Sequence, residues 1–135
     1  MFEIFKEFTF EAAHQLAVNV GDGHPYARLH GHSFKVEIFL RGEADPMTNW
    51  VDFGKIDRRL QDLREQLDHR YLNDIKGLEI PTLECISRWI WQRLHKSLPS
   101  IDRVLVRRGR CGEGCVFSDR VATQKFPHHW WHKSR

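Results

Sequence analysis

The sequence comprises 135 residues with a net charge of +3 and 41% hydrophobic residues, which is enough for one domain with a buried core. This charge does not indicate nucleic-acid binding, and no apolar run approaches the roughly 18–20 residues that span a bilayer, so we expect neither kind of partner. Three cysteines and an acidic N-terminal segment, unlike a signal peptide, predict reduced thiols and a cytoplasmic location.

The N-terminal third of the chain has the pattern of two strands. Polar and apolar residues alternate over 2–11, with Phe8 and Phe10 on the apolar face, which predicts a half-buried strand. Residues 15–31 lack a period and contain glycine and proline, so they predict a long loop. Alternation returns over 32–42 and predicts the second strand.

Helical periodicity follows in the middle of the chain. Apolar residues recur over 53–67 at the spacing of one helix face, which predicts the first helix. Thr82 is suited to cap the start of a second helix. That helix is expected to run to about Leu98, because Pro99 cannot continue it.

Two further strands are predicted at 101–107 and about 115–121. Two hairpins that flank a helix pair predict an α+β fold, with a four-stranded antiparallel sheet and both helices on one face. Such a sheet has open edges, so we expect self-association. The fold is expected to occupy residues 1–120, followed by a basic and aromatic tail at 121–135.

Three histidines form a candidate metal site. His30 and His32 are two residues apart at the start of a strand, so their side chains share one face, roughly 6–7 Å apart at the backbone. His14, at the end of the preceding strand, is the third candidate ligand. Three histidine nitrogens predict a zinc ion with a fourth position for water or substrate, as in catalytic sites. The alternative is chance proximity of three of the nine histidines.

Four ordered motifs give the chain a family resemblance. They are Phe10-Glu11-Ala12-Ala13-His14, Leu29-His30-Gly31-His32-Ser33, Leu67-Asp68-His69 followed by Tyr71-Leu72-Asn73, and Pro81-Thr82-Leu83-Glu84. From residue 1 to about 118 the chain resembles the 6-pyruvoyltetrahydropterin synthase family, above all its bacterial 6-carboxytetrahydropterin synthase branch, which acts in queuosine biosynthesis.

This resemblance implies the tunnelling fold, in which three subunits close a barrel and two trimers stack into a hexamer. It implies zinc on His14, His30 and His32, active sites at subunit interfaces, and a dihydropterin triphosphate substrate. It also implies that Asp68 and His69 form an acid–base pair. A carboxylate-held histidine is a good proton carrier at neutral pH. The alternative for His69 is a histidine that interacts with the dipole of a helix C-terminus.

The chain departs from the family pattern at two positions. Tyr26 stands where the family has a cysteine that moves a proton, and Tyr26 is therefore a candidate catalytic residue. The strand that carries the family's pterin-binding glutamate reads Val104-Leu105-Val106-Arg107-Arg108 instead, so guanidinium donors replace a carboxylate acceptor. The candidate substrate-binding residues are Thr82, Glu84, Arg107, Arg108 and Arg110.

Three functions remain open on the sequence. The first is a zinc-dependent lyase acting on a dihydropterin triphosphate, with Tyr26 in place of the thiol and the arginines on the phosphates. The second keeps the zinc and the Asp68–His69 pair but acts on an aldehyde or sugar phosphate, by cleavage, enolisation or a condensation such as a Pictet–Spengler-type cyclisation. The third is a non-catalytic pterin- or metal-binding relative. A small, phosphorylated partner molecule is expected for the enzymes.

Overall fold

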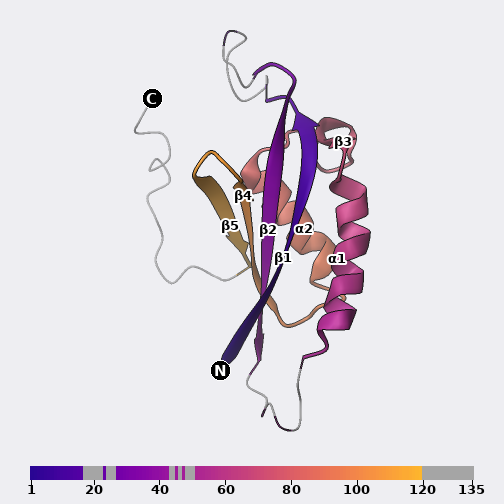
Figure 1. The fold of residues 1–135 in the computed structure, drawn as a ribbon, viewed down its shortest axis with the longest axis vertical. Coiled ribbons are helices and arrows are strands. Elements are labelled where there is room, and N and C mark those ends of the chain that lie inside the picture. Colours follow the sequence, from indigo (N-terminus) through magenta and orange to yellow (C-terminus); the bar gives the residue numbers. More distant parts are fainter. Residues whose placement is uncertain (17–22, 24–26, 43–44, 46, 48–50, 120–135) are drawn as a thin grey trace.

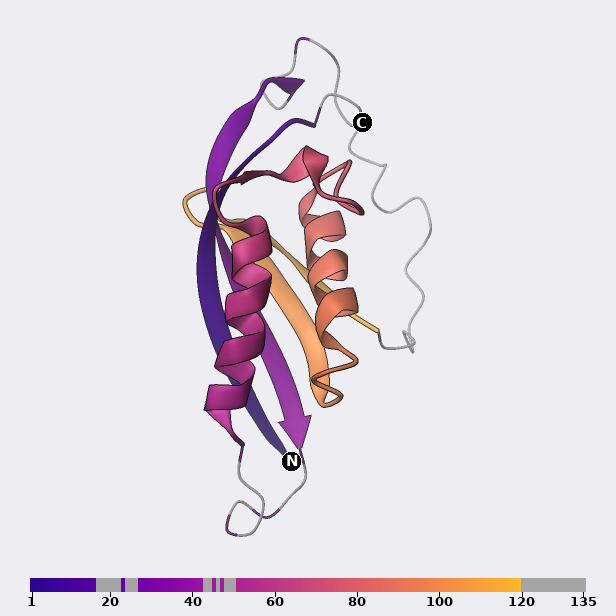
Figure 2. The same ribbon diagram turned by 90° about the vertical axis from the view of Figure 1, so that its right-hand side faces the viewer.

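One mixed β-sheet with two helices packed on one face forms the structure (Figures 1 and 2). The computed structural model describes residues 1–16, 23, 27–42, 45, 47 and 51–119. The strands follow the order β3-β1-β2-β4-β5 across the sheet. Within these ranges no helix is long and apolar enough to cross a membrane.

The two longest strands pair along their whole length. β1 spans Phe2–His14 and β2 spans His30–Gly42, antiparallel to β1, so that His14 lies directly opposite His30. Both strands are longer at this end than the alternation predicted, because small residues and histidines continue the ladder there without an apolar–polar signal. The extension matters for function because it places two histidines on one cross-strand pair.

The remaining strands correct the predicted four-stranded sheet. β4 (Ile101–Arg108) pairs with β2, and β5 (Glu113–Ser118) pairs with β4, both antiparallel. A fifth strand, β3 (Arg70–Tyr71), runs parallel to β1 at its free edge. Two residues carry no periodicity, so the sequence pattern could not predict β3.

Both helices begin where they were predicted, α1 from its apolar period and α2 from its cap Thr82. α1 spans Phe53–Leu67, and the Asp52 carboxylate accepts a hydrogen bond from Gly54 N at 2.9 Å. A 3₁₀ turn, η2 (Leu72–Asp74), leads towards α2 (Leu83–Leu94), whose cap Thr82 accepts from Cys85 N at 3.2 Å.

The end of α2 differs from the prediction. The helix stops at Leu94 and not at Leu98. Pro99 has no amide hydrogen for the His95 carbonyl, and the Ser97 and Leu98 amides both donate to the Leu94 carbonyl instead. The Leu98 bond keeps the α-helical spacing of four residues and the Ser97 bond spans only three, so the chain leaves the helix through one irregular turn after Leu94.

The core lies between the sheet and the helices. Alternate strand residues such as Phe10, Phe34 and Val36 pack there against Leu60 and Ile90. The rings of Phe10 and Phe34 stack with centroids 4.9 Å apart. The same sheet face continues beyond Phe34 towards His32 and His14, so the candidate metal site is built on one end of the core.

Candidate active site

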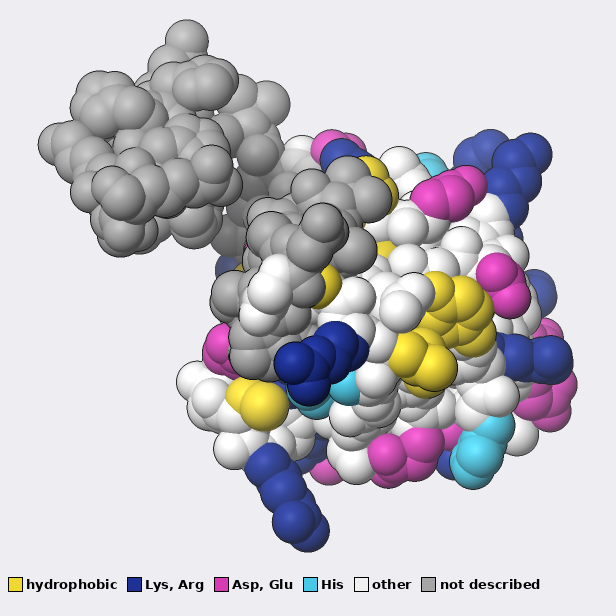
Figure 3. Space-filling model, turned by 90° about the horizontal axis from the view of Figure 1, so that it is seen from above, with side chains coloured by type: hydrophobic (Ala, Val, Ile, Leu, Met, Phe, Trp, Pro, Cys, Tyr) yellow, Lys and Arg dark blue, Asp and Glu magenta, His cyan; other side chains and the backbone are white. Residues whose placement is uncertain are grey.

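Three imidazole rings converge on the helix-covered face of the sheet, at the end of β1 and the start of β2. One ring nitrogen from each of His14, His30 and His32 lies within 4.8 Å of the others. The centroid separations are 4.4 Å for His14–His30, 5.1 Å for His14–His32 and 4.8 Å for His30–His32. Figure 3 looks down on this end of the molecule and shows histidine side chains beside charged ones.

Backbone carbonyls orient two of the rings. His14 Nδ1 lies 3.0 Å from the Pro81 carbonyl oxygen, and His30 Nδ1 lies 2.7 Å from that of Arg28. A carbonyl only accepts, so each Nδ1 carries the proton and each Nε2 keeps its lone pair. The Nε2 atoms of His14 and His32 are buried and have no hydrogen-bond partner within the described ranges. This donor set fits zinc.

Burial keeps the rings in the form that binds metal. Burial lowers the pKa of His14 to about 4, helped by the charges of its histidine neighbours and Arg108 and opposed by the bond to Pro81. Burial also lowers the pKa of His32, with Arg108 as the next cause. Both rings are therefore neutral at pH 7, and only a neutral imidazole can be a ligand.

The metal-free protein should lose stability on mild acidification. The unfolded chain protonates His14 near pH 6.5 and the folded chain only near pH 4, so the unfolded state binds more protons between these values. We expect the free energy of unfolding to fall by about 2 kcal/mol from pH 7 to pH 5. Urea denaturation of chelator-treated protein measures this. The dependence should be weaker in His14→Gln and unchanged in His95→Gln, and an equally steep fall in His14→Gln would contradict it.

The Asp68 carboxylate and the His69 imidazole lie in contact at the end of α1. The Asp68 carboxylate accepts from Glu11 N at 2.9 Å and lies 3.2 Å from Arg64 Nη2 and 3.0 Å from His69 Nδ1. The Glu11 amide is the main cause that lowers the pKa of Asp68, and the bond to His69 and the charge of Arg64 add to it. The ionised Asp68 carboxylate therefore holds the His69 ring through its Nδ1 atom.

The backbone of His69 is unusual. His69 has φ +58°, the only positive φ of a non-glycine residue in the described ranges, and its side chain is 79% exposed. Its amide donates to the Glu11 carbonyl at 2.6 Å, which ties this conformation to the edge of β1. A left-handed residue is common directly after the C-cap of a helix, so this φ fits the end of α1, and the contact with the Asp68 carboxylate is what makes His69 a candidate proton carrier.

A groove of about 550 Å³ runs between His69 and one member of the histidine group, His32. It is lined by Glu11, Ala12, Ala13, Gly31, His32, Ser33, His69, Arg70 and Tyr71. The Ser33 hydroxyl lies 2.8 and 2.7 Å from the two carboxylate oxygens of Glu11. Sequence reasoning missed Glu11, Ser33 and Arg64 as site residues, although Glu11 and Ser33 stand inside the motifs that contain the histidines.

The three arginine candidates lie in three different environments. Arg107 is exposed on the helix-free face, where its Nη2 lies 3.2 Å from the Glu37 carboxylate. Arg108 is buried on the opposite face, and its Nη1 donates to Glu113 at 2.6 Å. Arg110 is exposed in the turn before β5. The arginines therefore do not form one phosphate-binding cluster.

The other candidates are placed as follows. Thr82 caps α2, directly after the Pro81 carbonyl that orients His14, while Glu84 is exposed in the first turn of the helix. Tyr26 and the tail at 121–135 lie outside the described residues. Burial raises the pKa of the Cys115 thiol, so Cys115 is not an activated thiol that could replace the family's cysteine.

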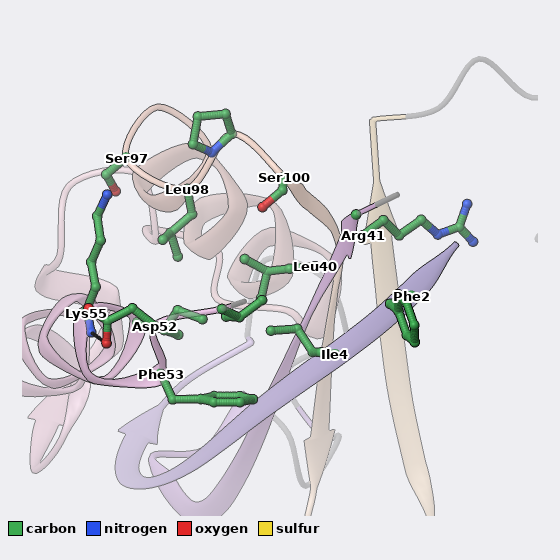
Figure 4. A pocket seen from close by; sticks show the side chains of 14 residues that line it. Phe2, Ile4, Leu40, Arg41, Asp52, Phe53, Lys55, Ser97, Leu98 and Ser100 are labelled. Carbon is green, nitrogen blue, oxygen red and sulfur yellow. Dashed lines mark hydrogen bonds between the residues drawn. The ribbon is translucent and has the colours of Figure 1, made fainter. Parts of the chain in front are cut away.

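A second cavity, of about 630 Å³, lies at the other end of the sheet (Figure 4). Its walls are mostly apolar and include Phe2, Ile4, Leu40 and Leu98, and its acidic residue Asp52 already caps α1. Its guanidinium, that of Arg41, lies 3.5 Å from the Asp102 carboxylate, and no histidine is among the described residues that line it. The groove beside the histidine group is therefore the better candidate active site.

Comparison with known proteins gave matches to a family model, to relatives in sequence and to solved structures. The family model described as 6-pyruvoyl tetrahydropterin synthase matches residues 3–119. A 6-carboxy-5,6,7,8-tetrahydropterin synthase from Synechocystis is 37% identical over 129 residues, covering 90% of this chain and 98% of the relative. A dihydroneopterin monophosphate aldolase from Pyrococcus furiosus is 35% identical over 91 residues, covering 67% of this chain and 73% of the relative. The structure of Caenorhabditis elegans 6-pyruvoyl tetrahydropterin synthase superposes with a TM-score of 0.78 at 20% identity, covering 88% of this chain and 96% of that one.

Proposed function

Because the chain belongs to the 6-pyruvoyl tetrahydropterin synthase family, we propose that it is a zinc-dependent lyase acting on a dihydropterin triphosphate in the pterin pathway that leads to queuosine. The observation that carries this proposal is the convergence of three histidine ring nitrogens, with a groove that runs from one of these residues, His32, to the carboxylate-held His69. The names of the two relatives, a carboxytetrahydropterin synthase and an aldolase, support lyase chemistry on a pterin.

In this proposal each group has a defined task. His14, His30 and His32 hold the zinc, which when bound polarises a substrate oxygen and lowers the pKa of a bound hydroxyl. His69 moves a proton at Nε2, because its Nδ1 is held by Asp68. Arg64 and the Glu11 amide fix the Asp68 carboxylate, so the imidazole keeps one orientation. These contacts position the proton carrier before substrate arrives.

The active site is proposed to lie between subunits. Asp68 and His69 lie along the free edge of β1, and the largely exposed side chain of His69 extends from this edge. Glu11, to which they are bonded, is three residues before His14, roughly 10 Å along the strand. A neighbouring copy that closes this edge would receive His69 beside its own histidine group.

The chain is expected to be a hexamer in solution, built from two trimeric barrels. Open edges at β3 and β5 favour pairing between copies. Light scattering should give six times the chain mass of 16.1 kDa. A monomer at micromolar concentration would rule out the barrel and the shared site together.

The similarity to a dihydroneopterin monophosphate aldolase favours a second candidate, carbon–carbon cleavage of a phosphorylated side chain. Here the same zinc site and His69 would act on an aldehyde-forming substrate. Incubation with 7,8-dihydroneopterin triphosphate and monophosphate, with and without a chelator, separates the two. Elimination releases inorganic triphosphate, whereas cleavage releases a phosphorylated aldehyde. The absence of both products, or turnover that survives complete zinc removal, would contradict the proposed function.

A further inference from the structure

An ion pair between a buried arginine and a partly exposed glutamate lies beside the histidine group. Arg108 is 6% exposed at the end of β4, on the same sheet face as the core residues Val104 and Val106. Its cross-strand partner on β2 is Phe34, whose ring lies 5.7 Å from the rings of both His14 and His32. The guanidinium therefore stands next to the row of side chains that carries the candidate ligands.

Glu113 completes the pair from the neighbouring strand. It is the first residue of β5 and lies directly opposite Arg108 in the register. Arg108 Nη1 donates to Glu113 Oε1 at 2.6 Å, while the Glu113 side chain stays 44% exposed. The arginine thus fixes one oxygen, and the exposed side of the carboxylate can accept hydrogen bonds from a ligand.

Both charges act on the candidate metal ligands. Arg108 contributes to the lowered pKa of His14 and of His32, whereas Glu113 acts on His32 in the opposite direction. Glu113 therefore lies close enough to His32 to act on its charge, on the sheet face that carries Arg108. A ligand held at the histidine group has a carboxylate acceptor nearby on the same sheet face.

Two other carboxylates near the site, those of Asp68 and Glu11, are already engaged. Asp68 is occupied by the Glu11 amide, Arg64 and His69. The two carboxylate oxygens of Glu11 lie at the Ser33 hydroxyl, and Glu11 lies on the strand face opposite to His14. Glu113 is thus the carboxylate best placed for a ligand between the helices and the sheet.

We propose that Glu113, oriented by Arg108, binds the amino-pyrimidinone edge of the dihydropterin, which presents adjacent N–H donors. This inference rests on the proposed function and names a specificity residue for it. A carboxylate matches two parallel donors, whereas a guanidinium facing them would leave donors unpaired. The pair therefore supplies, from β5, the acceptor that the arginines of β4 cannot provide.

The main competitor is that Arg108 itself binds a phosphate of the substrate. For Arg108 to bind a phosphate, its guanidinium would have to release the Glu113 carboxylate. The two possibilities predict opposite effects of removing the Glu113 charge. Binding of a dihydropterin should weaken if Glu113 is the acceptor, whereas binding of inorganic triphosphate should tighten if Arg108 is the receptor.

The test compares Glu113→Gln with Glu37→Gln. Glu37 forms the corresponding pair with Arg107 on the other face of the same sheet, so its variant is a matched control. Calorimetric titration of the zinc-loaded proteins with unphosphorylated 7,8-dihydroneopterin should show affinity about 10- to 100-fold weaker for Glu113→Gln and unchanged for Glu37→Gln. Zinc content should stay the same in both.

Unchanged dihydroneopterin affinity in Glu113→Gln, or tighter binding of inorganic triphosphate, would overturn the inference and leave the proposed function intact. No dihydroneopterin binding by the unmodified protein would instead overturn the proposed function. If Glu113→Gln fails to fold because Arg108 is left unpaired, the double variant Arg108→Met with Glu113→Gln removes both charges. The same loss of affinity is expected in that variant, and retained affinity would contradict the proposal.

Discussion

Alanine at His30 is expected to abolish stoichiometric zinc binding and, with it, turnover. The side chain supplies one of three ring nitrogens that lie within 4.8 Å of one another. Two remaining histidines cannot form the three-ligand site that zinc needs in a catalytic centre. Removing a group that only hydrogen-bonds a metal-binding histidine typically costs about 10- to 100-fold in metal affinity. Removing the metal-binding histidine itself should therefore cost more than about 100-fold. Metal analysis after dialysis measures the stoichiometry.

His95→Ala is the matched control for this experiment. His95 stacks on Trp91 at the end of α2 and its Nδ1 faces backbone carbonyls there, away from the histidine group. This variant should keep one zinc per chain. Full zinc content in His30→Ala would show that the ligand set is wrong, since no other described residue joins the three histidines in a metal-binding group.

The elements that the sequence predicted best are those with a strong period and a clear cap. α1 has the predicted bounds because its apolar stripe runs over the whole helix, and the Asp52 cap seen in the structure fixes the same start. The end of α2 was predicted less well, because Pro99 shows that a helix must stop but not how many residues earlier it stops. The helix ends at Leu94, five residues before the proline. β3 was missed because it exists only through its contact with β1.

The candidate site shows the same division. The histidine group was predictable, because alternation puts His30 and His32 on one face and the following strand pairing brings in His14. The contacts around it were not. Arg64 reaches the Thr9 carbonyl, 55 positions away in sequence, and Glu113 meets Arg108 only because the intervening turn sets their register. Such contacts depend on tertiary structure and leave no local pattern.

Removal of the His69 imidazole is expected to lower turnover by about 10²- to 10⁴-fold while zinc stays bound, as for a positioned proton carrier. His69→Asn accompanies His69→Ala, because asparagine tolerates the φ of +58° better than alanine does. Both variants should therefore show the same loss, measured as kcat on the dihydropterin substrate. Wild-type turnover in His69→Asn would return His69 to the role of a helix-end residue.

A mixture of the two inactive variants tests where the site is assembled. If the histidine group of one subunit works with His69 of the next, hexamers reassembled from equal amounts of His30→Ala and His69→Asn contain intact sites. Random assembly pairs an intact histidine group with an intact His69 in about one quarter of the sites, so about a quarter of the activity should return. If both groups act within one subunit, no intact site forms and the mixture stays inactive. The recovered activity therefore decides whether the exposed His69 at the edge of β1 serves its own chain or its neighbour.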